Sequence, residues 1–269
     1  MSSAQEQFFG HYGPWAMVAG ASEGLGAAWA EALASRGLSL LLCARREGPL
    51  GELASTLAQR YPVQLRTLVL DLSVPEDVGT LLDEAQRLEL GLVVYNAAAS
   101  PVGAFLQQDE ARLDKVLQTN CQTPSVVLRR LLPAMQARRR GGVVLMSSMA
   151  GFQGAEQLVA YAASKAYLRV LAEGLWAELR PHGVHVMACV AGATRTPGYL
   201  ASLEAGKRSP GELEPAEVVQ SALEALGTGP VHVPGMTNRA AARFLSLLPK
   251  RWSVALFSSN TRKLRSERS

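Results

Sequence analysis

A tyrosine and a lysine four residues apart form the most suggestive chemical pair in the sequence. Tyr161 and Lys165 lie in a segment of strongly helical composition, so both side chains should share one face of a helix. An ammonium near a phenol favours the phenolate and lowers its pKa from about 10. Such a tyrosine can exchange a proton with a substrate oxygen. The pair also has a purely structural interpretation, in which the tyrosine packs in the core and the lysine extends to solvent.

Two serines favour the chemical interpretation. Ser147 and Ser148 directly follow an apolar run, residues 143–146, and Ser148 precedes Tyr161 by thirteen residues. If the run is a strand of a parallel sheet, the serines lie at the carboxyl edge, where doubly wound folds bind ligands. A hydroxyl there can donate a hydrogen bond to a substrate oxygen and stabilise charge as it develops.

A glycine-rich turn near the N-terminus is a candidate phosphate site. An apolar run, residues 15–19, leads into Gly-Ala-Ser-Glu-Gly-Leu-Gly, and a helix-like segment follows at once. Glycines let the backbone turn tightly and approach a pyrophosphate, and the helix N-terminus supplies amide dipoles. A plain strand-to-helix turn is the alternative. The residues expected to contact a dinucleotide here are Gly20, Ser22, Glu23, Gly24, Leu25 and Gly26.

These groups must be positioned by the surrounding elements, which alternate in type along the chain. We expect strands at 15–19, 39–43, 63–70, 92–95, 143–146, 184–190 and 231–233, and helices at 24–35, 49–60, 75–88, 109–139, 157–180 and 214–226. Short apolar strands between helices are typical of a parallel sheet that is buried on both faces. The predicted fold class is α/β, a doubly wound parallel sheet (Rossmann fold) of about seven strands with helices on both faces.

The chain divides into one large domain and two short extensions. We assign residues 1–12 to an N-terminal extension, 13–235 to the Rossmann-fold domain, and 236–269 to a C-terminal helical extension with a basic tail. Hydrophobic residues make up 48% and charged residues 19% of the 269, which is enough apolar material for a large core.

The formal net charge of +4 is concentrated locally, as in the run 138–140, which we interpret as a solvated helix end. A nucleic-acid patch would need aromatic or helix-in-groove support that the sequence lacks. Cys43, Cys121 and Cys189 are far apart, so we expect neither a disulfide framework nor a metal site. We also expect no signal peptide and no transmembrane segment, and a cytoplasmic location.

Together, the motifs resemble those of the short-chain dehydrogenase/reductase family. The Gly-x-x-x-Gly-x-Gly loop, the Ser-Ser after a central strand and the Tyr-x-x-x-Lys helix all match in type and spacing, over about residues 13–235. The resemblance implies an oxidoreductase domain with a catalytic tetrad: Asn120, Ser148, Tyr161 and Lys165. It also implies the remaining cofactor contacts: Asp71, Leu72, Asn96, Ala97, Tyr161, Lys165, Thr194 and Thr196.

Four positions depart from the family pattern. Ala19 stands where threonine is usual, and Tyr95 and Ala98 replace an asparagine and a glycine around Asn96. Ala191 replaces a proline before Gly192, which is expected to loosen the loop on the nicotinamide side.

The end of the second strand bears on cofactor preference. It reads Cys-Ala-Arg-Arg and lacks the acid that NAD enzymes of this fold use to bind the ribose hydroxyls. Arg45 can instead offer a bidentate fork to a 2′-phosphate. Glu23 opposes this assignment, because its charge could repel the phosphate or pair with Arg45, and a solvent-facing arginine pair is the alternative. We predict NADP(H) as the preferred cofactor, with NAD(H) as the second choice.

The resemblance implies an NAD(P)H-dependent oxidoreductase that reduces a ketone or aldehyde, or oxidises the matching secondary alcohol, with Tyr161 as proton donor or acceptor. The segment 197–210 is expected to form a mobile lid over a small-molecule substrate. A homodimer or homotetramer is expected through helices 109–139 and 157–180. Two alternatives stay open: a non-catalytic nicotinamide-binding regulatory protein, and a peripheral-membrane fatty-ketoacyl or steroid reductase anchored by residues 244–257 and the basic tail.

Overall fold

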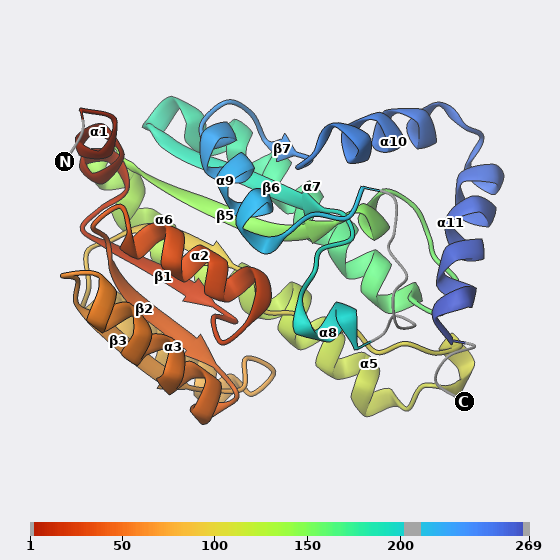
Figure 1. Ribbon diagram of the computed structural model, residues 1–269, viewed down its shortest axis with the longest axis horizontal. Helices are drawn as coiled ribbons and strands as arrows, with labels where there is room; N and C mark the ends of the chain where they lie inside the picture. Colours follow the sequence, from red (N-terminus) through yellow and green to blue (C-terminus); the bar gives the residue numbers. More distant parts are fainter. Residues whose placement is uncertain (1–2, 202–210, 266–269) are drawn as a thin grey trace.

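A seven-stranded sheet forms the centre of the molecule (Figure 1). The computed structural model describes residues 3–201 and 211–265, and its strands follow the order β3-β2-β1-β4-β5-β6-β7. Every neighbouring pair of strands is parallel. The predicted doubly wound α/β fold is therefore confirmed.

The strands span the following residues: β1 Trp15–Ala19, β2 Ser39–Ala44, β3 Leu65–Val69, β4 Leu90–Tyr95, β5 Gly141–Ser148, β6 Val184–Ala191 and β7 Val231–His232. The helices are α1 Ser3–Tyr12, α2 Gly24–Ala34, α3 Glu47–Arg60, α4 Pro75–Gln86, α5 Glu110–Leu117, α6 Thr123–Arg138, α7 Val159–Leu179, α8 Pro197–Leu200, α9 Pro215–Ala225, α10 Met236–Leu247 and α11 Lys250–Arg265. The expected helix over 109–139 is divided by a π-helical turn, η2 (Gln118–Gln122). Most of the expected lid, residues 202–210, lies outside the described residues.

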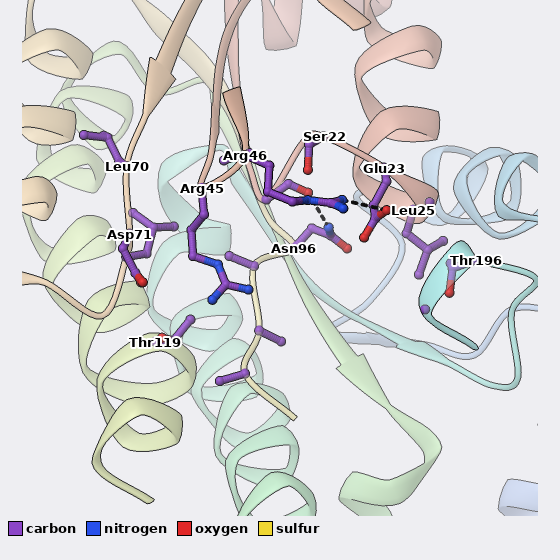
Figure 2. A pocket seen from close by; sticks show the side chains of 18 of the residues that line it. Ser22, Glu23, Leu25, Arg45, Arg46, Leu70, Asp71, Asn96, Thr119 and Thr196 are labelled. Carbon is purple, nitrogen blue, oxygen red and sulfur yellow. Dashed lines mark hydrogen bonds and ion pairs between the residues drawn. The ribbon is translucent and has the colours of Figure 1, made fainter. Parts of the chain in front are cut away.

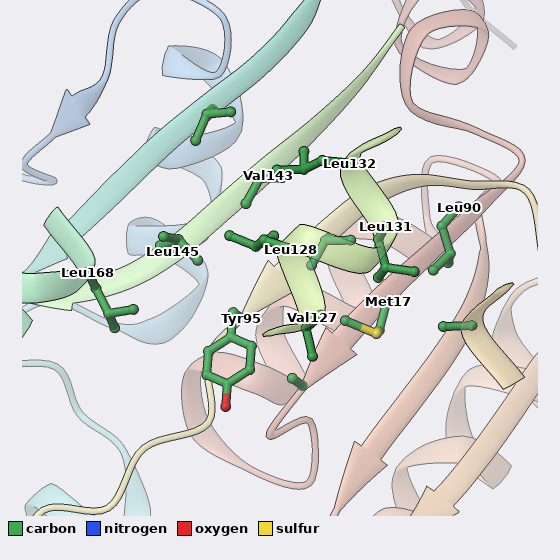
Figure 3. Packing of buried hydrophobic residues seen from close by; sticks show 14 of the residues in the cluster. Met17, Leu90, Tyr95, Val127, Leu128, Leu131, Leu132, Val143, Leu145 and Leu168 are labelled. Atoms are coloured by element: carbon green, nitrogen blue, oxygen red, sulfur yellow. The ribbon is translucent and has the colours of Figure 1, made fainter. Parts of the chain in front are cut away.

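Alternation along each strand creates a separate core on each face of the sheet. Met17 and Val93 join the cluster beneath α4, α6 and α7, to which Tyr95 also belongs (Figure 3). Their neighbours Val18 and Val94 join the opposite cluster with α2, α3 and α9. Successive side chains on a strand point to opposite faces, so continuous apolar runs are needed to fill both cores.

The arginine run 138–140 ends helix α6, as the sequence suggested, but Arg138 and Arg140 are partly buried rather than fully solvated. Arg139 takes a left-handed conformation (φ 54°) at the C-cap. The guanidinium groups donate hydrogen bonds to backbone carbonyls: Arg138 to Leu90, and Arg140 to Gly10 and Gly13. The run therefore ties the end of α6 to the start of β4 and to the end of α1.

The topology places a switch point between β1 and β4. The chain runs from β1 through β2 to β3 on one side and then crosses to β4 on the other side of β1. In open parallel sheets, ligands bind at the carboxyl ends of the strands at such a point. Among the described residues, no helix is long and apolar enough to cross a membrane, and no group of His, Cys, Asp or Glu side chains is arranged to hold a metal ion.

Candidate active site

The turn after β1 is shaped by its glycines. Gly20 (φ +78°) and Gly24 (φ +55°) adopt left-handed conformations that side chains disfavour. A Cβ at Gly20 would lie 2.7 Å from Ala97 Cα, and one at Gly24 would lie 2.7 Å from Thr196 Cγ2. The turn therefore packs its bare backbone against the segments that follow β4 and β6.

A hydrogen bond braces this turn against the neighbouring strand. The side-chain amide of Asn96 donates to Gly20 O at 2.8 Å. Gly26, in the first turn of α2, leaves no room for a side chain because a Cβ there would collide with the Gly20 carbonyl. These contacts give the loop a fixed shape that leaves backbone free to approach a ligand closely.

A pocket of about 300 Å³ lies above the carboxyl ends of β1, β2 and β4 (Figure 2). Its lining includes most of the residues expected to bind a cofactor: Gly20, Ser22, Glu23, Gly24, Leu25, Arg45, Asp71, Leu72, Asn96, Ala97 and Thr196. Four residues predicted to contact the cofactor do not line it: Gly26, Tyr161, Lys165 and Thr194. Gly26 supports the loop from behind, and Thr194 is buried with its hydroxyl donating to Gly192 O at 3.1 Å.

One end of the pocket holds an ion pair that the sequence did not reveal. Asp71 accepts a hydrogen bond from Lys115 of α5 at 2.8 Å and two more from Ser73. Partial burial works to raise the pKa of Asp71, but these partners outweigh burial and lower it to about 2. Asp71 is therefore a fixed anion, and its position in the pocket depends on Lys115.

The two arginines after β2 have different partners. Arg46 pairs with Glu23 at 2.7 Å, across a partly exposed contact. Figure 2 shows Arg45 extending from the end of β2 toward the pocket. Within the described residues, Arg45 forms no ion pair. Glu23 thus neutralises Arg46 and leaves Arg45 as the uncompensated cation of the pocket.

The end of β5 presents its two serines to opposite faces. Ser147 is buried and donates to Lys165 O on α7 at 2.7 Å, so it ties strand to helix. Ser148 is partly exposed, and its hydroxyl lies beside the phenol of Tyr161. Strand alternation therefore selects Ser148 as the hydroxyl beside the tyrosine.

Tyr161 and Lys165 share a face of α7, as predicted from their spacing. Lys165 is buried, and its Nζ donates to Met146 O at 2.7 Å and lies 5.6 Å from the centroid of the Tyr161 ring. Burial lowers the pKa of Lys165 to about 8. Burial also raises the pKa of Tyr161, against the opposing hydrogen bond from Ser148. The net shift for Tyr161 is opposite to the expected lowering, because desolvation of the phenolate dominates.

The π-helical turn η2 sets the orientation of Asn120. Its side-chain amide donates to Ala99 O and Ser164 Oγ, both at 2.9 Å, and its carbonyl oxygen accepts from Ala99 N at 2.8 Å. Such π-turns are often found at functional sites. Asn120 thereby links the segment after β4 to the helix that carries Tyr161 and Lys165.

The structure therefore brings all four predicted tetrad residues to one edge of the sheet, beside the pocket. Pocket residues that sequence reasoning missed are Ala44, Arg46, Leu70, Ala98, Ala99, Lys115, Thr119 and Gly198. Most of these are neighbours of residues that were predicted. Lys115 belongs to no motif, and only the fold could bring it to Asp71.

Comparisons with known proteins agree with this geometry. Residues 14–205 match the family described as short chain dehydrogenase. A 7beta-hydroxysteroid dehydrogenase of Clostridium sardiniense is 31% identical over 229 residues, which is 85% of this chain and 88% of the relative.

Two solved structures share the fold over most of the chain. One comes from work on the stereoselectivity of a 7beta-hydroxysteroid dehydrogenase. It has a TM-score of 0.87 and 25% identity, and the match covers 93% of this chain and 98% of that one. The other, a short-chain dehydrogenase from Sphingobium yanoikuyae in complex with NADPH, has a TM-score of 0.78 and 29% identity over 87% of this chain and 92% of that one. With its glycine turn, sheet topology and tetrad in place, the chain belongs to the short-chain dehydrogenase family.

Proposed function

We propose that this protein is an NADP(H)-dependent oxidoreductase that interconverts a ketone and the matching secondary alcohol. The observation that carries the proposal is the placement of Ser148 and Tyr161 side by side next to buried Lys165, at the edge of a pocket suited to a dinucleotide. The family assignment and the NADPH complex of a relative support the cofactor class.

The pocket fits a nicotinamide dinucleotide. Gly20 and Gly24 line the pocket with bare backbone that a pyrophosphate can approach closely, and the N-terminus of α2 follows directly. Asp71 and Leu72 would hold the adenine end, while Asn96, Ala97 and Thr196 lie toward the tetrad. When bound, the dihydronicotinamide supplies the hydride.

The protein's own residues handle the proton and the charge. A raised pKa keeps Tyr161 protonated, so its hydroxyl can donate a proton to the substrate oxygen. Ser148 stabilises the charge that develops on the same oxygen. Lys165, charged below pH of about 8, favours departure of the proton from Tyr161, and Asn120 fixes the position of the segments around it.

The preference for NADP(H) rests on Arg45. Its guanidinium faces the pocket without an ion-pair partner among the described residues, whereas Glu23 is occupied by Arg46. A guanidinium can bind a phosphate through two parallel hydrogen bonds.

We further propose a bulky apolar ketone or alcohol as substrate, with steroids as the first candidates. The relatives named 7beta-hydroxysteroid dehydrogenase favour this class. Leu158 and Phe257 pack in the same small cluster as Tyr161, so the wall beside the tyrosine is apolar. A charged sugar or amino acid would find little complementary surface there.

We also propose a homo-oligomer built on α6 and α7. Val126, Tyr167 and Val170 on these helices are 40%, 41% and 55% exposed. A self-complementary contact across a two-fold axis would cover them. Light scattering that shows only monomer at micromolar concentration would exclude this assembly.

The test of the catalytic assignment compares two tyrosines of one helix. In Tyr161→Phe, oxidation of NADPH with a panel of steroid ketones should fall at least ~100-fold, the usual scale of acid–base catalysis. Tyr167→Phe removes the same atom from an exposed side chain of α7 and should keep wild-type turnover. A wild-type protein that binds NADPH but turns over no carbonyl compound would favour the non-catalytic alternative.

A further inference from the structure

Helices α10 and α11 turn apolar side chains outward. On α10, Met236, Phe244 and Leu247 are 79%, 57% and 83% exposed, and on α11 Trp252 and Leu256 are 58% and 49% exposed. The side chains that these two helices bury include several polar ones: Asn238, Ser253, Ser258 and Thr261. This is the reverse of the pattern that a helix usually shows at the surface of a soluble domain.

Hydrogen bonds hold α11 in this orientation. Ser258 Oγ accepts from Glu156 N at 3.1 Å, and Thr261 Oγ1 donates to Glu156 O at 2.7 Å. Arg262 pairs with the Glu156 carboxylate at 3.0 Å, and Lys250 donates to Phe152 O at 3.1 Å. Because the polar side is fixed to residues 152–156, Trp252 must face away from the core.

The same region is strongly basic. Residues 225–266 contain no aspartate or glutamate. Arg243, Lys250 and Arg251 are exposed, and in the part of the chain that the structure describes none of them forms an ion pair. They flank Phe244, Leu247 and Trp252 in sequence, where α10 meets α11 at the outer corner of the molecule (Figure 1).

We propose that this corner, formed by Arg243, Phe244, Leu247, Lys250, Arg251 and Trp252, docks the protein on an anionic lipid surface. Exposed aromatic and leucine side chains next to Lys and Arg are the combination that interfacial helices use. A second copy of the chain fits less well, because a two-fold contact would place each cationic corner against its own like charges. The inference stands apart from the proposed reaction, since it needs no catalytic residue.

Docking at this corner would bring lipid toward the substrate side. The inner side of α11 carries Phe257, which packs against the same small cluster of buried alanines as Leu158 and Tyr161. The helix that faces lipid therefore also backs the wall beside the catalytic tyrosine, and an apolar substrate dissolved in the bilayer would have a short path to it.

The test is co-sedimentation of the full chain with vesicles of phosphatidylcholine alone and of phosphatidylcholine with phosphatidylglycerol. We expect binding to the anionic vesicles only, weaker at high salt because screening acts on exposed charges. Neutralising Arg243→Gln or Arg251→Gln should each weaken binding about fivefold. The double variant Phe244→Glu, Leu247→Glu should abolish it.

Two controls distinguish binding through this corner from non-specific binding to vesicles. Val69→Glu alters a valine that is 50% exposed on β3, at the opposite end of the sheet from β7, and should bind vesicles like wild type. Thermal melting should be unchanged in the two arginine variants, which alter only exposed side chains. Absence of wild-type binding to anionic vesicles, equal binding to both lipids, or unweakened binding by the arginine variants would each overturn the proposal. Binding to soluble polyphosphate would also overturn the proposal if the wild type binds it as tightly as the vesicles and the Phe244→Glu, Leu247→Glu variant keeps this binding.

Discussion

The arrangement of Arg45, Arg46 and Glu23 makes a quantitative prediction about cofactor choice. Arg45→Ala would remove a guanidinium that faces the pocket and, among the described residues, forms no ion pair. A charge-assisted hydrogen bond contributes about 1.5–3 kcal/mol, and the exposure of Arg45 favours the lower end. The loss in kcat/KM for NADPH should be about 10- to 30-fold. The value for NADH should change little, because it has no 2′-phosphate.

The Glu23–Arg46 pair allows the opposite perturbation. Both side chains are about half exposed, so the pair itself is worth only about 0–1 kcal/mol. Glu23→Gln removes an anion from the pocket and frees Arg46 to reach the same phosphate. We therefore expect kcat/KM for NADPH to rise by up to about fivefold. The gain should disappear in the double variant Glu23→Gln, Arg46→Ala if Arg46 makes the new contact.

The assay is initial-rate kinetics with both cofactors at a fixed concentration of one steroid ketone. A wild-type enzyme that prefers NADH, or an Arg45→Ala variant that keeps the wild-type NADPH value, would refute the reasoning. A lower NADPH value in Glu23→Gln would show that Glu23 positions the loop after β1 rather than opposing the phosphate.

Three further predictions concern the tetrad and the loop. Carbonyl reduction needs charged Lys165 and protonated Tyr161, and both are the forms present at low pH, so kcat should fall as the pH rises through about 8. A pH profile in which kcat rises across this range would contradict the assignment. Gly20→Ala should weaken NADPH binding about tenfold or more in a fluorescence titration, because a left-handed backbone conformation costs a residue with a side chain roughly 1–2 kcal/mol and the new Cβ would lie 2.7 Å from Ala97 Cα. An unchanged affinity would show that the loop is not part of the binding site. Ser148→Ala should lower kcat about 100-fold and leave the melting temperature unchanged. Ser147→Ala should mainly lower the melting temperature, because the Ser147 hydroxyl donates a hydrogen bond to Lys165 O in the interior, and the reverse result would exchange the roles of the two serines.

Local motifs were predictable because their chemistry depends on short spacings. The distance from Tyr161 to Lys165 along a helix, and from Ser148 to the end of a strand, follows from backbone geometry alone. The order of elements likewise follows from alternating apolar runs. Contacts between distant segments were not predictable: Lys115 meets Asp71 across 44 residues of sequence, and Glu23 selects Arg46 rather than Arg45.

Two local features also escaped the sequence. The π-helical turn at Gln118–Gln122 has no compositional signature, although it orients Asn120. The sequence offered residues 244–257 as a membrane anchor only as an alternative, because hydrophobicity alone would bury Trp252 and Leu256 and expose Ser253 and Ser258. The structure does the opposite because Ser258 and Thr261 satisfy backbone groups of Glu156.

The departures from the family pattern can be weighed by the direction in which each residue points. Ala19, Tyr95 and Ala191 are buried in the two core clusters, and of the four departures only Ala98 lines the pocket. The hydroxyl of Tyr95 donates to Thr119 O at 2.6 Å, within the turn that carries Asn120. Ala191 pairs with Ser148 in the sheet, so the strand end beside the tetrad keeps its register. Three of the four substitutions therefore alter how the site is supported from within. They give little support to a protein that has lost turnover, since Ser148, Tyr161 and Lys165, the residues proposed to act in catalysis, are retained.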